Sequence, residues 1–487
     1  MDARRGSVNR LARFTKYEKL LVFLFLLTLP LSNPWVRGDG VGYYAFARSL
    51  LIEHRLDFTK DWLAANASYR TGRTDALGNI LPNQYTSTGH LDNHFSVGPA
   101  ILWSPFLVVA HAGVLVYDRI GGQIPADGFS KPYRVAMALG TAVYGFLALL
   151  ISFGLARRYV SERWAFLATL GIWFASSLPV YMYFNPSWSH AQSAFTVALF
   201  LWYWVRTRGA RTWPQWAILG AIGGLMMDVY YVSAVLVLMP FLESLQEFLN
   251  SRKGGGMPAM ARLFFGNVIF TVALVAVFLP TLVTKQIIYG SYAKSGYENL
   301  WVWTSPWVLN ASFSADHGLF SWTPILIAGV VGLFFLARYD REVAIYLILV
   351  FAAVLYTIGC YKNWDGLSSF GNRYFIALTP IYVLGLAAFF DGLERAWNER
   401  GALIASAAAT TVLILWNLGL IFQWGTHMIP VRGPISWRDA AYNQFALVPT
   451  EASQTVKNYL THRKGLMDQI EQEDVDQLKT KREQGTQ

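Results

Sequence analysis

The chain has 487 residues, of which 54% are hydrophobic and 14% are charged. A soluble domain carries about 25% charged residues, so this composition excludes an ordinary soluble enzyme and predicts an all-α polytopic membrane protein. The single cysteine, Cys360, excludes an intrachain disulfide framework. The net charge of +10 lies largely in short loops between apolar segments, where membrane topology explains it. We therefore expect no nucleic-acid partner.

About eleven apolar segments are predicted to cross the membrane as helices. The first follows a basic N-terminus and lacks a small-x-small cleavage pattern, so we interpret it as a retained signal-anchor helix. A further stretch, 97–117, contains Pro99 and Pro105 and is predicted to be re-entrant or peripheral. The predicted spans are 18–34, 133–156, 164–182, 190–205, 214–227, 231–248, 263–284, 322–337, 343–360, 374–390 and 402–424.

The basic residues set the predicted orientation. Those before the first span predict a cytoplasmic N-terminus, because short cytoplasmic segments are enriched in Lys and Arg. If 97–117 does not cross, the basic groups at 157–158, 206–211 and 338–341 also fall inside. The sequence thus predicts an integral protein embedded in the lipid bilayer, with its N-terminus inside and its polar site on the outer side.

Polar stretches are predicted to gather on the outer face. Residues 228–230 form the tip of a helical hairpin, and the Trp-rich stretch 299–307 is predicted to lie as a juxtamembrane helix in the membrane plane. Residues 1–424 are predicted to form one membrane module, followed by a polar tail at 425–487 that is solvated helix or disorder, with no assigned role. The outer stretches are 35–132, 183–189, 228–230, 285–321, 361–373 and the tail.

Asp39 is the first candidate for chemistry. It follows the first span and is flanked by Gly38, Gly40 and Gly42, which allow close approach of another group. A helical pattern begins directly after it, so Asp39 fits a helix N-cap. The same carboxylate fits a base that deprotonates an acceptor hydroxyl, or a metal ligand.

Histidines supply further candidates. His90, Asp92 and His94 are spaced so that they could bind a metal, but no paired Cys/His motif follows, and a polar loop without metal is the simpler interpretation. His190 begins a predicted span at the outer boundary, where it fits an interfacial polar residue or a hydrogen-bonding partner of a sugar or phosphate. His317 precedes another span on the same face.

Cations on the predicted outer face are candidates for binding phosphate. Lys285 precedes the loop that contains His317, and Arg373 follows Asp365 in a Gly- and Ser-rich loop. Guanidinium groups bind phosphate oxygens in bidentate fashion, whereas an interfacial anchor is the alternative role for Arg373. The chain contains no Walker A motif, dinucleotide fingerprint or Gly-x-Ser-x-Gly elbow, so nothing supports ATP, NAD or serine-hydrolase chemistry.

In their order and spacing, these motifs resemble the GT-C superfamily of integral-membrane glycosyltransferases, which includes protein O-mannosyltransferases, oligosaccharyltransferase catalytic subunits and lipid A aminoarabinose transferases. The resemblance covers about residues 15–425. It rests on Asp39 followed by Tyr43-Tyr44, the stretch from Asn93 to Pro99, the turn with Pro186 and His190, the run from His317 to Pro324, and Trp364-Asp365-Gly366 with Gly371-Asn372-Arg373.

The resemblance implies a GT-C-like bundle in the bacterial inner membrane, with its active site on the periplasmic or extracellular side. It also implies transfer of a sugar from a polyprenyl-phosphate donor to a lipid, glycan or protein acceptor. Asp39 is then the catalytic acid or base, Arg373 contacts the phosphate, and His190 or His317 contacts donor or acceptor. A divalent cation is possible, and its ligands are unknown. The residues expected to bind substrate are Tyr43, His94, His190, Lys285, His317, Asp365 and Arg373.

One departure and two alternatives accompany this expectation. Relatives often carry an Arg at the hairpin tip where this chain has Asp228, which removes a phosphate contact or inverts the local charge. That change favours a catalytically silent scaffold of the same fold. A transporter or flippase for lipid-linked glycans is the other alternative, but it requires polar residues midway along several spans, and here the charges lie at span ends.

Overall fold

The structure of the chain, a computed structural model, describes residues 15–254 and 256–483. Its regular secondary structure over these ranges is helical, and β-pairing is limited to isolated bridges. The all-α class is therefore confirmed. Short 3-10 or π segments adjoin several helices, at Leu29–Leu31, Ser49–Glu53, Pro82–Gln84, Val180–Phe184, Tyr231–Val237, Glu298–Leu300 and Arg373–Leu378.

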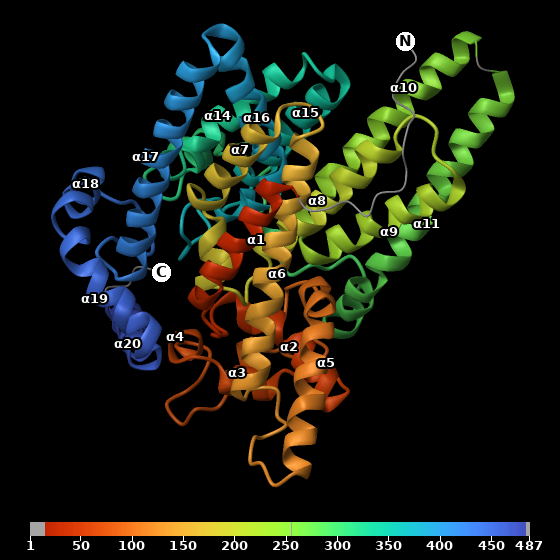
Figure 1. Cartoon of the computed structure of the whole chain (residues 1–487). Coiled ribbons are helices and arrows are strands. Elements are labelled where there is room, and N and C mark those ends of the chain that lie inside the picture. The colour runs from red at the N-terminus through yellow and green to blue at the C-terminus, as the bar shows by residue number, and fades with distance from the viewer. Residues whose placement is uncertain (1–14, 255, 484–487) are drawn as a thin grey trace.

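The bundle contains one helix for each predicted span (Figure 1). Seven helical segments of the described chain are long and apolar enough to cross a membrane, as an integral membrane protein requires; α5 (Gly98–Arg119) is among them. The bundle helices are α1 (Lys16–Thr28), α6 (Lys131–Ala156), α7 (Glu162–Phe174), α8 (His190–Thr207), α9 (Trp213–Val229), α10 (Leu238–Gly254), α11 (Gly256–Tyr289), α14 (Ile325–Leu336), α15 (Arg341–Gly359), α16 (Thr379–Ala396) and α17 (Glu399–Gly425).

Small residues let neighbouring bundle helices approach closely. A Cβ at Gly332 would lie 1.8 Å from the carbonyl oxygen of Gly385, where α14 meets α16. Similarly, a Cβ at Gly220 of α9 would lie 2.2 Å from the Phe270 carbonyl oxygen of α11. Helices in lipid associate through such close packing because burial against lipid tails supplies little hydrophobic driving force.

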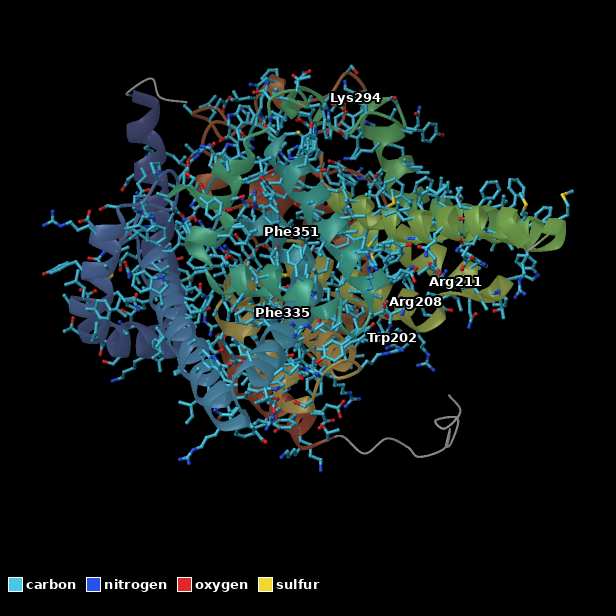
Figure 2. All side chains as sticks on the ribbon, turned by 90° about the horizontal axis from the view of Figure 1, so that it is seen from above. Trp202, Arg208, Arg211, Lys294, Phe335 and Phe351 are labelled. Carbon is cyan, nitrogen blue, oxygen red and sulfur yellow. The ribbon has the colours of Figure 1, made fainter. Side chains whose placement is uncertain are left out.

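Ion pairs gather the basic loops at one end of the bundle. Arg157 contacts Glu18 at 3.0 Å, Arg163 pairs with Glu394, and Arg208 pairs with Asp340. The first contact joins α1 to the connection between α6 and α7, and the other two join the start of α7 to the end of α16 and the connection after α8 to the one after α14. This grouping agrees with the predicted topology. Figure 2 shows the α10–α11 hairpin projecting from one side of the bundle, with Arg208 near its base and the C-terminal helices on the opposite side.

The other end carries the remaining helices (Figure 1). Here α5 runs beside the first half of α6: Trp103 Nε1 donates to Thr141 Oγ1 at 2.8 Å, and His111 Nδ1 lies 2.6 Å from the Tyr133 hydroxyl. That α5 does not cross the membrane stays a prediction. The helices at this end are α2 (Asp39–Arg48), α3 (Thr59–Ala64), α4 (Ala67–Arg70), α5, α12 (Val308–Phe313), α13 (Leu319–Trp322), α18 (Trp437–Ala446), α19 (Val448–Thr461) and α20 (Arg463–Glu483).

Two segments differ from the sequence interpretation. Most of the predicted helix at 299–307 is turn and bridge, because Trp301 pairs in a β-bridge with Tyr361 and stacks on Trp303 at 5.3 Å. That prediction was wrong, since a Trp-rich composition indicates an interface but no particular backbone conformation. The C-terminal tail is helical and folds back onto the outer loops, so it is not simply a solvated extension.

Candidate active site

An ion pair between Asp39 and Arg373 lies at the centre of the outer end. Arg373 Nη1 donates to Asp39 Oδ2 at 2.6 Å. Gly38, with φ of 54°, is the N-cap of α2, so Asp39 is the first helical residue and its side chain turns to Arg373. A Cβ at Gly40 would lie 1.9 Å from Ser187 Oγ, so only glycine at this position allows the first turn of α2 to pack directly on the 183–189 loop.

Aromatic rings fix the Arg373 guanidinium. Its Cζ lies 4.2 Å from the ring centroid of Trp188 and 5.3 Å from that of Tyr374. Trp188 Nε1 in turn donates to the Arg37 carbonyl at 2.9 Å. The ring that packs on Arg373 is therefore tied to the loop just before Asp39. The Nε atom of Arg373 has no partner among the described residues. The guanidinium is thus held in place and still has donor capacity.

His317 supports the loop that leads to Arg373. Its Nδ1 donates to the Asp365 carbonyl at 3.0 Å and lies 3.5 Å from Asp316. Burial lowers the pKa of His317 to about 4, so the ring is neutral at pH 7 and the Asp316 contact is not an ion pair. Its Nε2 is buried with no partner in the described chain.

Asp316, His317 and Asp365 could together hold a metal ion, because one ligand atom from each lies within 4.8 Å of the others. Burial raises the pKa of both carboxyls, and the nearby Arg432 opposes that shift. The three side chains do not line the main cavity, so a cation here would stabilise the loop before Arg373 and would not touch a substrate. Arg432 already supplies positive charge at this position.

A cavity of about 1350 Å³ contains the Asp39–Arg373 pair. We name two sets of its lining residues the aromatic arm and the apolar arm. The aromatic arm is lined by His94, Tyr297, Trp301, Tyr361 and Tyr374. The apolar arm is lined by residues of α17, α19 and α20.

Tyr43 and His94 lie on the cavity wall near Asp39. Burial raises the pKa of Tyr43, with a further contribution from the charge of Asp39, so its phenol stays protonated and can donate. Burial also lowers the pKa of His94, whose ring packs on Tyr297 at 4.8 Å. Both residues therefore present neutral groups to the cavity at pH 7.

His190 begins α8 and also lines the cavity. Its ring meets the edges of Tyr181 at 4.9 Å and Tyr230 at 5.6 Å, and its Nδ1 has no partner among the described residues. Such an atom can hydrogen-bond a ligand without giving up a protein contact.

Lys285 faces away from the cavity. It lies in α11, and its Nζ donates to the carbonyls of Asn93 at 3.3 Å and Phe95 at 3.0 Å. The ammonium group thus tethers the loop that carries His94 and does not line the cavity. A phosphate would have to displace two carbonyl acceptors to reach it.

The hairpin tip contributes aromatic residues to the cavity. Asp228 is fully buried, and its backbone packs so tightly on Gly98 that a Cβ there would lie 2.3 Å from Asp228. Tyr230 and Tyr231, directly after it, line the cavity, whereas Asp228 does not. The acidic residue therefore adds no negative charge to the cavity wall.

Among the predicted site residues, five line one cavity: Asp39, Tyr43, His94, His190 and Arg373. Lys285, His317 and Asp365 support the loops behind it. Sequence reasoning missed Trp188 and the tyrosines of the aromatic arm, because aromatic residues are common throughout a membrane protein. It also missed the C-terminal helices, for which the apolar residues of α19 at four-residue spacing were the available signal.

Two solved structures are similar to the chain. ArnT from Cupriavidus metallidurans, bound to undecaprenyl phosphate, is 14% identical with a TM-score of 0.49; the match covers 83% of this chain and 70% of ArnT. The Archaeoglobus fulgidus oligosaccharyltransferase, tethered with an acceptor peptide, is 14% identical with a TM-score of 0.43, over 85% of this chain and 57% of the enzyme. Both are membrane enzymes of the GT-C class that the sequence motifs resemble.

No protein-family model and no curated protein sequence matches the chain. Identities and TM-scores as low as those of the two solved structures do not by themselves establish its family. The chemistry of the cavity and of its ion pair therefore carries the functional argument.

Proposed function

We propose that the chain is an integral-membrane glycosyltransferase that moves a sugar from a polyprenyl-phosphate donor to a hydroxyl acceptor. The observation that carries this proposal is the Asp39–Arg373 pair, which puts a carboxylate and a guanidinium in contact in a cavity lined by both aromatic and apolar residues. We further propose that this site faces the periplasm or cell exterior, with a cytoplasmic N-terminus. The acceptor class, whether lipid, glycan or protein, stays open.

In the proposed reaction, Asp39 takes the proton of the acceptor hydroxyl as that oxygen attacks the anomeric carbon. The bond between this carbon and the phosphate oxygen breaks, and the phosphate leaves with the electron pair. Arg373 stabilises the charge that develops on the phosphate. Attack opposite to the leaving group inverts the anomeric centre, by analogy with inverting glycosidases.

The ion pair has to open for this chemistry to proceed. A sugar lies between base and leaving group during in-line attack, and inverting glycosidases keep their two carboxyls roughly 6.5–9.5 Å apart for a comparable reason. Asp39 and Arg373 are only 2.6 Å apart. Donor phosphate would compete with Asp39 for the guanidinium and release the carboxylate towards the acceptor.

The aromatic arm suits a sugar. Tyr297, Tyr361 and Tyr374 present ring faces, edges and hydroxyl groups, which together match the apolar faces and hydroxyls of a carbohydrate. The position of Asp228 outside the cavity removes the main reason to favour a silent scaffold. The pairs Arg157–Glu18 and Arg208–Asp340 lie near helix ends, which does not favour a transporter.

The test is transfer from undecaprenyl-phosphate sugars, radiolabelled in the sugar, into acceptors supplied by membranes of the host strain. We expect Asp39→Asn to abolish transfer while the protein stays folded in detergent, because the amide keeps the shape but cannot accept the proton. Asp118→Asn is the matched control, since Asp118 is exposed at the end of α5, outside the cavity. Transfer by Asp39→Asn at the parent rate would contradict the proposal.

A further inference from the structure

The C-terminal segment, defined as α18–α20, is fastened to the stretch of chain that leads to Asp39. Tyr459 donates its hydroxyl to the Leu31 carbonyl at 2.8 Å, and Arg463 Nη2 donates to the Pro30 carbonyl at 2.6 Å. Further along, Asp474 pairs with Arg37, two residues before Asp39. In Figure 1 the segment descends beside the outer loops, with α20 next to α4.

A second set of contacts holds the end of the segment. Glu471 accepts from the Ser68 backbone N–H at 2.6 Å, and His427 lies 2.8 Å from Glu473 and 3.3 Å from Asp474. These acidic residues raise the pKa of His427, so its charged form is favoured and strengthens the attachment. A solvated tail would not need so many specific contacts.

Most of the residues by which the C-terminal segment lines the cavity are apolar; the polar ones are Gln444, Thr455, Asp474 and Gln477. Val448, Ala452 and Val456 of α19 are spaced four residues apart, so they lie on one face of the helix. Leu466, Met467 and Ile470 of α20 continue that wall. Ser453 and Lys457 of α19 are exposed and do not line the cavity.

The opposite wall of the apolar arm is α17. Leu415 and Leu418 line the cavity and are also 61% and 42% exposed, on a helix apolar enough to cross a membrane. The apolar arm is therefore bounded on this side by a helix whose apolar side chains are not fully buried by protein. Apolar side chains on both walls make water an unfavourable occupant and a hydrocarbon chain a favourable one.

We propose that α19 and α20 form a chain-binding wall that sets which hydrocarbon chains the donor can carry. Arg37, two residues before Asp39, pairs with Asp474 of α20, and Arg373 packs on Tyr374, so the Asp39–Arg373 pair adjoins residues of both arms. A polyprenyl-phosphate sugar likewise joins a hydrocarbon chain and a sugar through a phosphate. This inference rests on the proposed function and assigns the C-terminal segment a role in donor selection.

The experiment narrows the apolar arm with Ala452→Trp and uses Ser453→Trp as the matched control on the outward face of the same helix. Transfer is measured with a short geranyl-phosphate sugar and a long undecaprenyl-phosphate sugar. We expect Ala452→Trp to raise KM for the long donor by about tenfold or more, because several CH₂ groups of its hydrocarbon chain can no longer be buried against the protein. KM for the short donor, and both values in Ser453→Trp, should stay within about twofold of the parent.

A binding measurement separates this inference from the proposed transfer. A photoreactive undecaprenyl phosphate without sugar is crosslinked to the full chain, and the labelled peptides are mapped by mass spectrometry. Label on 448–470 that Ala452→Trp abolishes and Ser453→Trp retains supports the wall even if no donor sugar is transferred. Label confined to other helices, displacement of the probe by excess bulk phospholipid, or equal KM changes for both donors would overturn it.

Discussion

Two buried arginine–carboxylate pairs illustrate different uses of the same chemistry. Arg211 contacts both oxygens of Glu243 at 2.9 and 2.8 Å, and that carboxylate also accepts from Trp204 Nε1 at 2.7 Å. The Arg211 and Glu243 side chains are 1% and 5% exposed. Arg373 makes one contact to Asp39, whose side chain is 36% exposed to the cavity. The first pair has its hydrogen bonds satisfied, whereas the second leaves donors and an oxygen for a ligand.

This difference separates stability from function. A fully satisfied buried pair stabilises the fold when intact and is costly to break, because one charge is left without a partner. An incompletely satisfied pair beside a cavity contributes less to the fold and offers its remaining donors to a charged substrate. Substitutions in the two pairs should therefore give opposite patterns of stability and activity.

The largest effect on stability is expected at the satisfied pair. Arg211→Ala should lower the free energy of unfolding by about 3–5 kcal/mol, because Glu243 stays buried without its cation. Folded protein that remains should bind undecaprenyl phosphate with parent affinity. Thermal unfolding in detergent and a lipid-binding titration measure the two quantities. A variant as stable as the parent would contradict the contrast between the pairs.

The largest effect on function is expected at the open pair. Arg373→Lys should lose about 1.5–3 kcal/mol in donor binding or turnover, because lysine keeps the charge but loses the guanidinium fork. Its midpoint of thermal unfolding should change little. Kinetics with varied donor, then with varied acceptor, locate the loss; an effect on acceptor KM alone would assign Arg373 to the acceptor. Parent kinetics in both Arg373→Lys and Arg373→Ala would leave it as an anchor.

His317 gives a pH-dependent test of the loop behind Arg373. Its pKa of about 4 in the folded state lies below the ordinary value of 6.5, so the unfolded chain binds the proton first as pH falls. Stability should therefore decrease as pH falls from about 6.5 to about 4, by roughly 1–3 kcal/mol. His317→Asn, which tolerates the left-handed backbone at φ of 58°, should remove this part of the decrease. Unfolding midpoints across that pH range provide the measurement.

The smallest effect is expected where the C-terminal segment pairs with Arg37. This pair is partly exposed, so Asp474→Asn should lower stability by only about 0.5–1 kcal/mol. The change should weaken attachment of α20 more at low salt than at high salt, because salt already screens the parent interaction. Limited proteolysis between α19 and α20 at two ionic strengths measures it. Equal proteolysis of parent and variant would show that other contacts suffice.

Sequence alone predicted the helices of the bundle and a grouping of its charged loops at one end. Long apolar runs specify helices in a membrane, because only a helix satisfies every backbone polar group within one segment. The charged loops then predict which connections share an end, and ion pairs such as Arg157 with Glu18 agree with that grouping. Asp39 and Arg373 could be placed on one face in this way.

Tertiary structure decided which of those residues meet. Asp39 and Arg373 are 334 positions apart, and their contact depends on Gly40 seating against Ser187 and on Trp188 supporting the guanidinium. By charge alone, Lys285 was as good a candidate for binding phosphate as Arg373. In the structure its ammonium group instead donates to two backbone carbonyls. Hydropathy is a local property of the chain, whereas side-chain direction depends on close contacts between distant segments. For that reason the C-terminal wall of the cavity emerged only once the chain was folded.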